Sequence, residues 1–273
     1  MLFLTSLLFL IVMLRYLIFA GGLFLLCWVW KRETWEWRRI VRERPPKKVL
    51  QSEFLWSCVT SLIFAITGAL VISVWEGGGT LLYTDLHHYG IVYAILSLFL
   101  MMLIHETYFY WTHRLLHAKS LFRRVHYVHH ESKNPTPWAA FSFHPIESII
   151  EAGFLPLIVF FMPTHVGVFL LFLMIMTVTS VFNHLGYELY PLAFVRIRLL
   201  RSVITATHHQ MHHRLVHCNY GLYFTWWDMI MKTHHKGYPE FFEEIYSRRP
   251  TEKNVQILGN RVIEPAPTSP ASG

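Results

Sequence analysis

The sequence predicts an all-α fold: a multi-pass bundle of membrane helices that carries a histidine-rich helical cap with a dinuclear metal site. Three observations lead to this prediction. Hydrophobic residues make up 53% of the 273-residue chain and charged residues only 15%, against about 25% charged in an average soluble domain. Four long apolar regions are separated by breaks. The chain also has 18 histidines, and many of them fall into short blocks.

The first two apolar regions each have the length of one membrane span. Leu2–Trp30 is apolar except for Arg15 and a few small polar residues. It is too long for the core of a signal peptide and no small-residue cleavage site follows it, so we expect a retained anchor. Phe54–Trp75 is the second span, and the turn that starts at Glu76 with three glycines ends it.

The third and fourth regions predict one long helix and one helical hairpin. Tyr89–Ile104 is short for a span, but it continues without a helix breaker into the segment that carries His113 and His117. One helix could therefore cross the membrane and emerge with both histidines. Ile149–Phe182 is interrupted at Pro163, which removes a helical hydrogen bond, so two antiparallel helices are expected there.

Basic residues predict which side of the membrane each break faces. Lys31–Lys48 holds eight Lys and Arg and is expected to be a solvated loop on the cytoplasmic side. Counting spans from this loop places the histidine blocks together on the cytoplasmic face. The net charge of +7 resides beside apolar segments, which is typical of contact with anionic lipid and not of nucleic-acid binding.

The histidine blocks predict metal binding. In a helix, positions i, i+3 and i+4 share one face, so each block can aim its imidazoles at one point. Eight imidazoles exceed what one ion takes, since zinc usually has four ligands, and two metal ions are therefore expected. Nitrogen ligands suit iron, zinc, copper or nickel. The three blocks are His113 and His117; His126, His129 and His130; and His209, His212 and His213.

Two further side chains are expected beside the metal ligands. Glu106 lies on the same helical stripe as His113 and His117, where it could accept the other N–H of a ligating imidazole. His208 adjoins the third block but faces about 100° away from His209, so we place it in an outer position. Cys27, Cys58 and Cys218 are scattered without a CxxC pair, which argues against a cysteine-bound metal.

The motifs together show a resemblance to a known family. The sequences HRLLH, HYVHH and HQMHH, with FSFHPIE, FNHLGYE and NYGLYFTWWD between and after them, resemble the fatty acid hydroxylase / sterol desaturase superfamily, and HESKNPTPWAAFSFHPIE is most similar to its sterol C5-desaturase branch. The resemblance covers roughly residues 90–236. It implies a catalytic domain at 90–236, preceded by the N-terminal membrane spans and the basic cytoplasmic loop at 1–89. The C-terminal tail, 237–273, is expected to be partly disordered because of the composition from Glu264 onward, EPAPTSPASG.

The resemblance also implies site residues. The eight block histidines match the family's metal ligands, and His184 sits where relatives place a further ligand. Glu188 follows one turn later, where some relatives have a second histidine. His144 and Glu147, in the HPIE segment, match positions that contact the ligands from outside.

The resemblance implies an enzyme that binds two iron ions and uses O2 to hydroxylate or desaturate a C–H bond of a sterol or fatty-acyl lipid. The membrane would be the endoplasmic reticulum of a eukaryote or the inner membrane of a bacterium. The chain has no haem-attachment motif and no glycine-rich nucleotide fingerprint. We therefore expect electrons from a separate protein, either cytochrome b5-like or a ferredoxin with its reductase. This protein is expected to dock on five arginines: Arg123, Arg124, Arg196, Arg198 and Arg201.

Two other classes remain as alternatives. A zinc-dependent membrane hydrolase could use a similar cage, although catalytic zinc keeps an open position with three protein ligands. A non-catalytic metal-binding or haem-binding membrane protein is the second alternative, although bis-histidine haem would need facing pairs within the spans, and these blocks lie beyond them.

Overall fold

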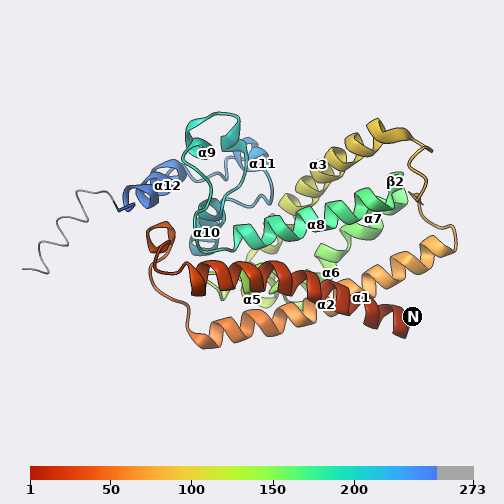
Figure 1. Cartoon of the computed structure of the whole chain (residues 1–273), viewed down its shortest axis with the longest axis horizontal. Helices are drawn as coiled ribbons and strands as arrows, with labels where there is room; N and C mark the ends of the chain where they lie inside the picture. Colours follow the sequence, from red (N-terminus) through yellow and green to blue (C-terminus); the bar gives the residue numbers. More distant parts are fainter. Residues whose placement is uncertain (251–273) are drawn as a thin grey trace, which may run out of the picture.

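A computed structural model describes residues 1–250, which are almost entirely helical (Figure 1). Four helical segments are long and apolar enough to cross a membrane: Leu2–Trp30, Lys47–Glu76, Gly90–Leu116 and Val166–Asn183. The predicted all-α, multi-pass membrane fold is therefore confirmed. The expected disordered tail, from Glu264, lies outside the described residues.

The first two spans form an antiparallel pair. α1 (Leu2–Tyr16) continues through two π-helical segments, η1 (Leu17–Gly21) and η2 (Phe24–Trp30), and α2 (Lys47–Glu76) runs back beside α1 (Figure 1). The Tyr16 hydroxyl donates to the Trp138 carbonyl over 2.8 Å, and Trp28 Nε1 donates to the Leu185 carbonyl over 2.9 Å. These bonds fix the first span to the segments that carry the histidines.

The third span is one uninterrupted helix, as predicted. α3 (Gly90–Leu116) has 27 residues, and at about 1.5 Å per residue it is longer than the ~30 Å hydrocarbon core of a bilayer. His113 lies in its last turn, and His117 follows as its C-cap.

The predicted hairpin around Pro163 is also present. α6 (Pro145–Ala152) and α7 (Phe154–Phe161) lead to the break, and α8 (Val166–Asn183) returns. β2 (Thr164–His165) pairs in parallel with β1 (Leu82–Tyr83), which precedes α3. The loop before α3 and the loop between α7 and α8 therefore meet at one end of the bundle. In Figure 1, α8 runs from β2 towards α10 at the opposite end.

A cap of short helices covers that opposite end. It contains η3 (Glu36–Arg38), α4 (Lys119–Leu121), η4 (Phe122–His126), α5 (Tyr127–His130), η5 (Pro137–Phe141), α9 (Ala193–Arg196), η6 (Leu200–Ser202), α10 (Ala206–Leu215), α11 (Trp226–Ile230) and α12 (Tyr238–Ser247). The histidine blocks lie at the junction between this cap and the spans.

Only the middle of the segment Lys31–Lys48 departs from the solvated loop that its charge predicts. Its flanks are exposed, for example at residues 32–34 and 42–44. In the middle, Arg39 is buried, its backbone forms a bridge with Tyr187, and its guanidinium lies over the Trp28 ring at 5.4 Å. Arg38 donates to the Glu188 carbonyl over 2.9 Å. This part packs because tryptophans lie between its charges and give it an apolar side.

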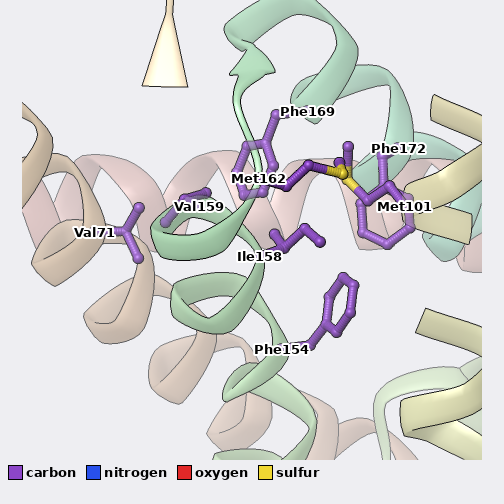
Figure 2. Close-up of a cluster of buried hydrophobic side chains, with 8 residues drawn as sticks. All are labelled: Val71, Met101, Phe154, Ile158, Val159, Met162, Phe169 and Phe172. Atoms are coloured by element: carbon purple, nitrogen blue, oxygen red, sulfur yellow. The ribbon is translucent and has the colours of Figure 1, made fainter. Parts of the chain in front are cut away.

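Apolar packing between four helices fixes the histidine-bearing ends. Figure 2 shows side chains of α2, α3, α7 and α8 meeting in one cluster: Val71, Met101, Phe154, Ile158, Val159, Met162, Phe169 and Phe172. In a bilayer this contact is stabilised mainly by close packing, because lipid is as apolar as the side chains. The cluster holds α3 and α8, which carry His113 in the last turn and His184 as the C-cap respectively.

A buried carboxylate joins α2 to the chain beyond the second histidine block. Glu53 is fully buried and accepts hydrogen bonds from the Ser132 hydroxyl (2.7 Å) and the Thr136 hydroxyl (2.5 Å). The Ser132 carbonyl accepts in turn from His213 Nδ1 over 3.0 Å. Glu53 therefore holds a segment that orients an imidazole.

We expect Glu53→Ala to lower the free energy of unfolding by about 2–3 kcal/mol, because two buried hydroxyls lose their acceptor. Reversible unfolding in mixed detergent micelles measures the change. Ser52→Ala is the matched control, since within residues 1–250 the half-buried Ser52 side chain bonds only to Glu131, over 3.3 Å. Equal stability of the two variants would contradict the role given to Glu53.

Candidate metal centre

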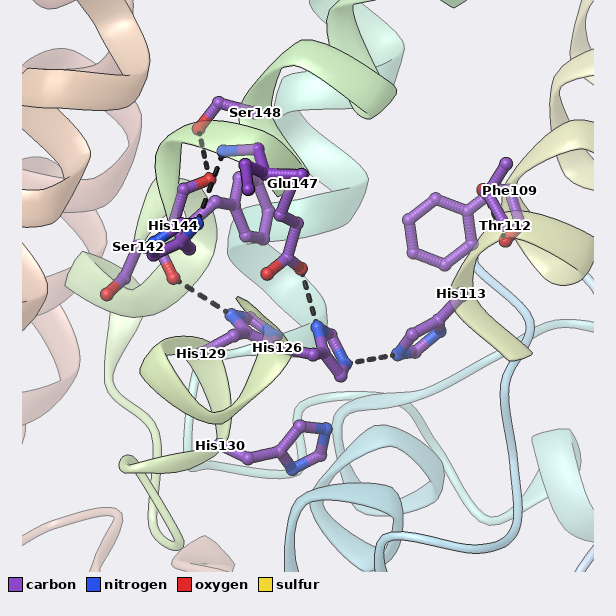
Figure 3. A network of polar contacts seen from close by, with 12 residues as sticks. Phe109, Thr112, His113, His126, His129, His130, Ser142, His144, Glu147 and Ser148 are labelled. Atoms are coloured by element: carbon purple, nitrogen blue, oxygen red, sulfur yellow. Dashed lines mark hydrogen bonds and ion pairs between the residues drawn. The ribbon is translucent and has the colours of Figure 1, made fainter. Parts of the chain in front are cut away.

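Nine histidines gather into two groups of nitrogen atoms, and within each group the atoms lie no more than 4.8 Å apart. Cluster 1 contains His113, His117, His126, His130 and His212; cluster 2 contains His129, His184, His209 and His213. All nine are residues that the sequence predicts as ligands. Every side chain except the half-buried His117 is buried. Figure 3 shows four of them, contributed by α3 and by the η4–α5 segment.

Each HxxHH block is divided between the clusters. His126 and His130 join cluster 1 while His129 joins cluster 2; in the other block, His209 and His213 join cluster 2. The expectation that each block aims at one point is therefore wrong for the two HxxHH blocks, whereas His113 and His117 do share cluster 1. At 100° per residue, i and i+4 are about 40° apart, whereas i+3 lies about 60° to the other side. Each block thus lies between the two clusters.

Imidazole tautomers show that the groups fit a bound cation. In cluster 2, His129 Nδ1 lies 3.3 Å from the Ser142 carbonyl and His184 Nδ1 lies 2.7 Å from the Ser180 carbonyl. A carbonyl only accepts, so both neutral rings carry their proton on Nδ1. Their Nε2 atoms are nevertheless 3.2 Å apart. Two lone pairs facing each other in a buried site are unfavourable without a cation between them.

Cluster 1 has the same arrangement with an added carboxylate. His113 Nδ1 donates to the Tyr220 carbonyl over 2.8 Å, and its Nε2 lies 3.1 Å from His126 Nε2. His126 Nδ1 lies 2.7 Å from Glu147 Oε1 (Figure 3). A carboxylate at this position fixes the ring of a metal-binding histidine and raises its basicity. Glu147 therefore has the outer contact that the sequence predicts.

Burial keeps the imidazoles neutral at physiological pH. It lowers the pKa of His184 to about 4, and burial together with the neighbouring His113 lowers that of His117 to about 2. The pKa values of six others are held well below the usual range, first by burial and then by neighbouring imidazoles: His126, His129, His130, His209, His212 and His213. Neutral imidazole is the form that binds metal.

Glu106 does not accept from an imidazole, contrary to expectation. Its carboxylate accepts the backbone N–H groups of Leu222, Tyr223 and Phe224, the shortest bond being 2.7 Å to Tyr223. A side chain at Gly221 would come within 2.8 Å of the carboxylate. Glu106 thus orients His113 only indirectly, through the loop whose Tyr220 carbonyl accepts from that ring.

Asp228 supports the same loop, and the sequence reasoning assigned it no role. Its carboxylate accepts the backbone N–H groups of Tyr220 (2.8 Å) and Gly221 (3.0 Å) and the Thr233 hydroxyl (2.7 Å). The segment NYGLYFTWWD contains both the loop and its acceptor, but a contact over seven and eight residues is not the local Asx turn that a sequence pattern can predict.

The other residues predicted beside the ligands either accept backbone N–H groups or lie away from both clusters. Glu188 accepts the N–H group of Thr207 (3.0 Å), at the start of α10, and that of the nearby Tyr190 (2.9 Å). His144 Nδ1 accepts from the Ile146 N–H over 3.3 Å and caps α6, which carries Glu147. The His208 ring lies beside His234 and Tyr238, at 5.3 and 5.1 Å, and belongs to neither cluster.

An apolar cavity adjoins both clusters. It has a volume of about 370 Å³ and lies among α1, α2, α3, α7 and α8. Phe109 and Phe143 line it, and their rings lie 5.1 Å from the rings of His113 and His129 respectively. Its ionisable lining residues are Arg15, His105 and Glu151. The cavity therefore extends from the membrane helices to the histidines.

The fold and site define a class of protein: a multi-pass membrane protein with two buried histidine clusters suited to metal ions, beside an apolar cavity. The profile of the family described as "Fatty acid hydroxylase" matches residues 98–233, which include all nine histidines. The chain belongs to this family, and the resemblance seen in its motifs is confirmed.

Several sterol-oxidising proteins are similar in sequence. The Delta(7)-sterol 5(6)-desaturase of Gibberella zeae is 32% identical over 163 residues, 60% of this chain and 49% of that protein. The lathosterol oxidase of Homo sapiens is 31% identical over 155 residues, 54% of this chain and 50% of that protein. The C-4 methylsterol oxidase of Schizosaccharomyces pombe is 27% identical over 197 residues, 69% of this chain and 65% of that protein. The chain thus spans about half the length of the first two relatives, and no solved structure matches it.

If each cluster holds an ion, a cluster left with three imidazoles should lose it. We expect about two metal ions per wild-type chain and about one in His130→Ala/His212→Ala or in His209→Ala, which leave three imidazoles in cluster 1 and cluster 2 respectively. His217→Ala, at an exposed position four residues after His213, is the control and should keep both. Elemental analysis of purified protein measures the ratio. An unchanged ratio in both cluster variants would refute the assignment.

The lowered pKa values predict little proton release on metal binding. Nine imidazoles with the usual pKa would release roughly four protons at pH 6.5, whereas neutral ones release fewer than about one. Calorimetric titration of the metal-free protein with Co²⁺, in two buffers of different ionisation enthalpy, measures this number. A release of several protons would contradict the prediction.

Because the folded pKa values are depressed, the unfolded chain binds more protons below about pH 6.5, and stability of the metal-free protein should fall as the pH is lowered.

Proposed function

We propose that this protein is a membrane oxygenase that uses two iron ions, O2 and two external electrons to desaturate or hydroxylate a C–H bond of a sterol-like lipid. The observation that carries the proposal is the pair of all-imidazole clusters beside an apolar cavity. For hydroxylation, substrate, O2, two electrons and two protons give an alcohol and water. For desaturation, the same reactants give an alkene and two waters.

Iron is proposed as the metal because the donor set and the family agree. Imidazole nitrogen binds several first-row metals, so the ligands alone do not select one. The family to which the chain belongs implies a non-haem iron site. When bound, iron would supply the oxidising power that an unactivated C–H bond requires and that no amino-acid side chain provides.

The protein's own residues would prepare the site. Carbonyl groups such as those of Ser180 and Tyr220 hold the proton on Nδ1 and leave Nε2 directed into the clusters. Glu147 holds the His126 ring in the same way. Phe109 and Phe143 would exclude water between the cavity and the imidazoles.

A sterol-like substrate is supported by the cavity and by the names of the relatives. The cavity is bordered by membrane helices, so a lipid could reach it from the bilayer without a soluble carrier. Its walls are mainly aromatic and aliphatic, which suits a rigid apolar body. The relatives are a Delta(7)-sterol desaturase and a lathosterol oxidase.

We also propose that electrons arrive from a separate protein at the cytoplasmic face. The positive charge of Lys31–Lys48 supports this orientation. Arg123 and Arg124 are exposed, and they precede His126 by only three and two residues. They would attract an acidic donor of the cytochrome b5 or ferredoxin type.

Expression in a sterol-producing host that lacks its own C5-desaturase tests the proposed function. We expect a new desaturated or hydroxylated sterol with the wild-type chain, and product reduced at least about 100-fold with His129→Ala, which removes a cluster 2 imidazole. His217→Ala is the control and should retain activity. Lipid mass spectrometry measures the product.

Metal content and O2 consumption separate this proposal from a hydrolase. Two irons per chain and reductant-dependent O2 uptake are expected. Two zinc ions with no uptake, and a hydrolysed lipid in place of an oxidised one, would establish the zinc-dependent alternative instead.

A further inference from the structure

A basic and apolar patch lies on the cap, outside the candidate metal centre. It surrounds a surface hollow of about 690 Å³. Its apolar members are unusually exposed: Leu199 is 79% exposed, Ile230 66% and Met229 62%. We call this surface the α9–α11 patch, and it consists of Arg196, Ile197, Arg198, Leu199, Arg201, Trp226, Met229 and Ile230.

The α9–α11 patch is joined to the surface that α3 presents to lipid. α11 packs on α3, where Trp227 Nε1 donates to the Thr107 hydroxyl over 3.1 Å and the Trp227 ring meets the Trp111 ring edge-on at 5.6 Å. Trp111 and Leu115 are 43% and 60% exposed and belong to the last turns of a membrane span. The neighbouring Trp226 of the patch is also exposed. The patch thus lies at the level where the span leaves the hydrocarbon.

The charge of the patch is largely uncompensated. Arg196 pairs with Glu243 over 3.0 Å at an exposed position. Arg198 and Arg201 form no ion pair within residues 1–250. All three arginines border the same hollow, and a guanidinium binds phosphate oxygens in a bidentate manner.

We propose that the α9–α11 patch binds the phosphate headgroups of anionic phospholipids and thereby seats the cap on the membrane surface. Tryptophan, aliphatic side chains and arginine side by side are the composition of a membrane-surface segment, with the apolar groups in the acyl boundary and the arginines at the phosphates. An acidic protein would explain the arginines but not exposed aliphatic side chains that continue from the lipid-facing side of α3. Three of the five arginines expected to bind the electron donor would then bind lipid instead. The proposed lipid binding does not depend on the proposed reaction.

Lipid retention tests the proposal on the full chain. The protein is reconstituted with equal phosphatidylglycerol and phosphatidylcholine, extracted mildly and examined by native mass spectrometry. We expect wild type to retain phosphatidylglycerol preferentially, and Arg198→Gln/Arg201→Gln to lose about tenfold or more of that preference. Arg123→Gln/Arg124→Gln removes the same charge elsewhere on the cap and should keep the preference. Equal retention in all three proteins would overturn the proposal.

A depth measurement on folded protein separates lipid from protein docking. A fluorophore on Met229→Cys should be quenched by nitroxide attached near the phospholipid headgroup, and only weakly by a water-soluble quencher. Quenching by the aqueous reagent alone would overturn the proposal. So would weaker, salt-sensitive binding of an acidic electron donor in the Arg198/Arg201 variant with unchanged lipid preference, because the patch would then be a protein-docking surface.

Discussion

Imidazole Nε2 atoms that face one another at about 3 Å, in rings that donate from Nδ1, are the constraint on which the cap depends. Such contacts repel unless a cation lies between them, so the protein must hold these rings against that repulsion. Glu147 holds the His126 ring, and main-chain carbonyls, which accept from Nδ1 and fix the ring plane, hold five further rings. The acceptors come from Ser132, Ser142, Ser180, Cys218 and Tyr220. Because these carbonyls belong to four separate segments of the chain, the site forms only when the cap and the spans are assembled together.

Buried carboxylates hold those carbonyls in place. Glu106 and Asp228 bind successive N–H groups of the loop that contains Tyr220. Glu188 binds N–H groups at the start of α10, and Glu53 holds the segment of Ser132. Only Glu147 contacts a cluster imidazole directly. The acidic residues therefore act mainly on the backbone, one step removed from the histidines, which lets them order the site without becoming ligands.

The sequence predicted the spans, the hairpin and the eight block histidines because each depends on local features: apolar length, one proline and helical spacing. His184 came instead from the resemblance to the family. Helical spacing did not show how each HxxHH block divides between the clusters, since the clusters form only when α5 and α10 meet in the folded chain. The same limit applies to Glu106. Its place on the helical stripe was predicted, but its hydrogen-bond donors come from residues more than a hundred positions later. The packed middle of the Lys31–Lys48 segment was not predicted, because the prediction rested on its charges and not on its tryptophans.

The division of each block has a mechanical consequence. His129 and His130 are adjacent in the chain yet belong to different clusters, as do His212 and His213. The two clusters therefore cannot move apart without unwinding α5 or α10. The spacing between two bound ions would be set by the peptide unit that joins the two adjacent histidines in each helix. The cavity that ends at Phe109 and Phe143 would present a lipid to both ions at once. Dividing each HxxHH block between the clusters suits a reaction that needs two metals at a fixed separation. Two independent metal sites would not require such a division.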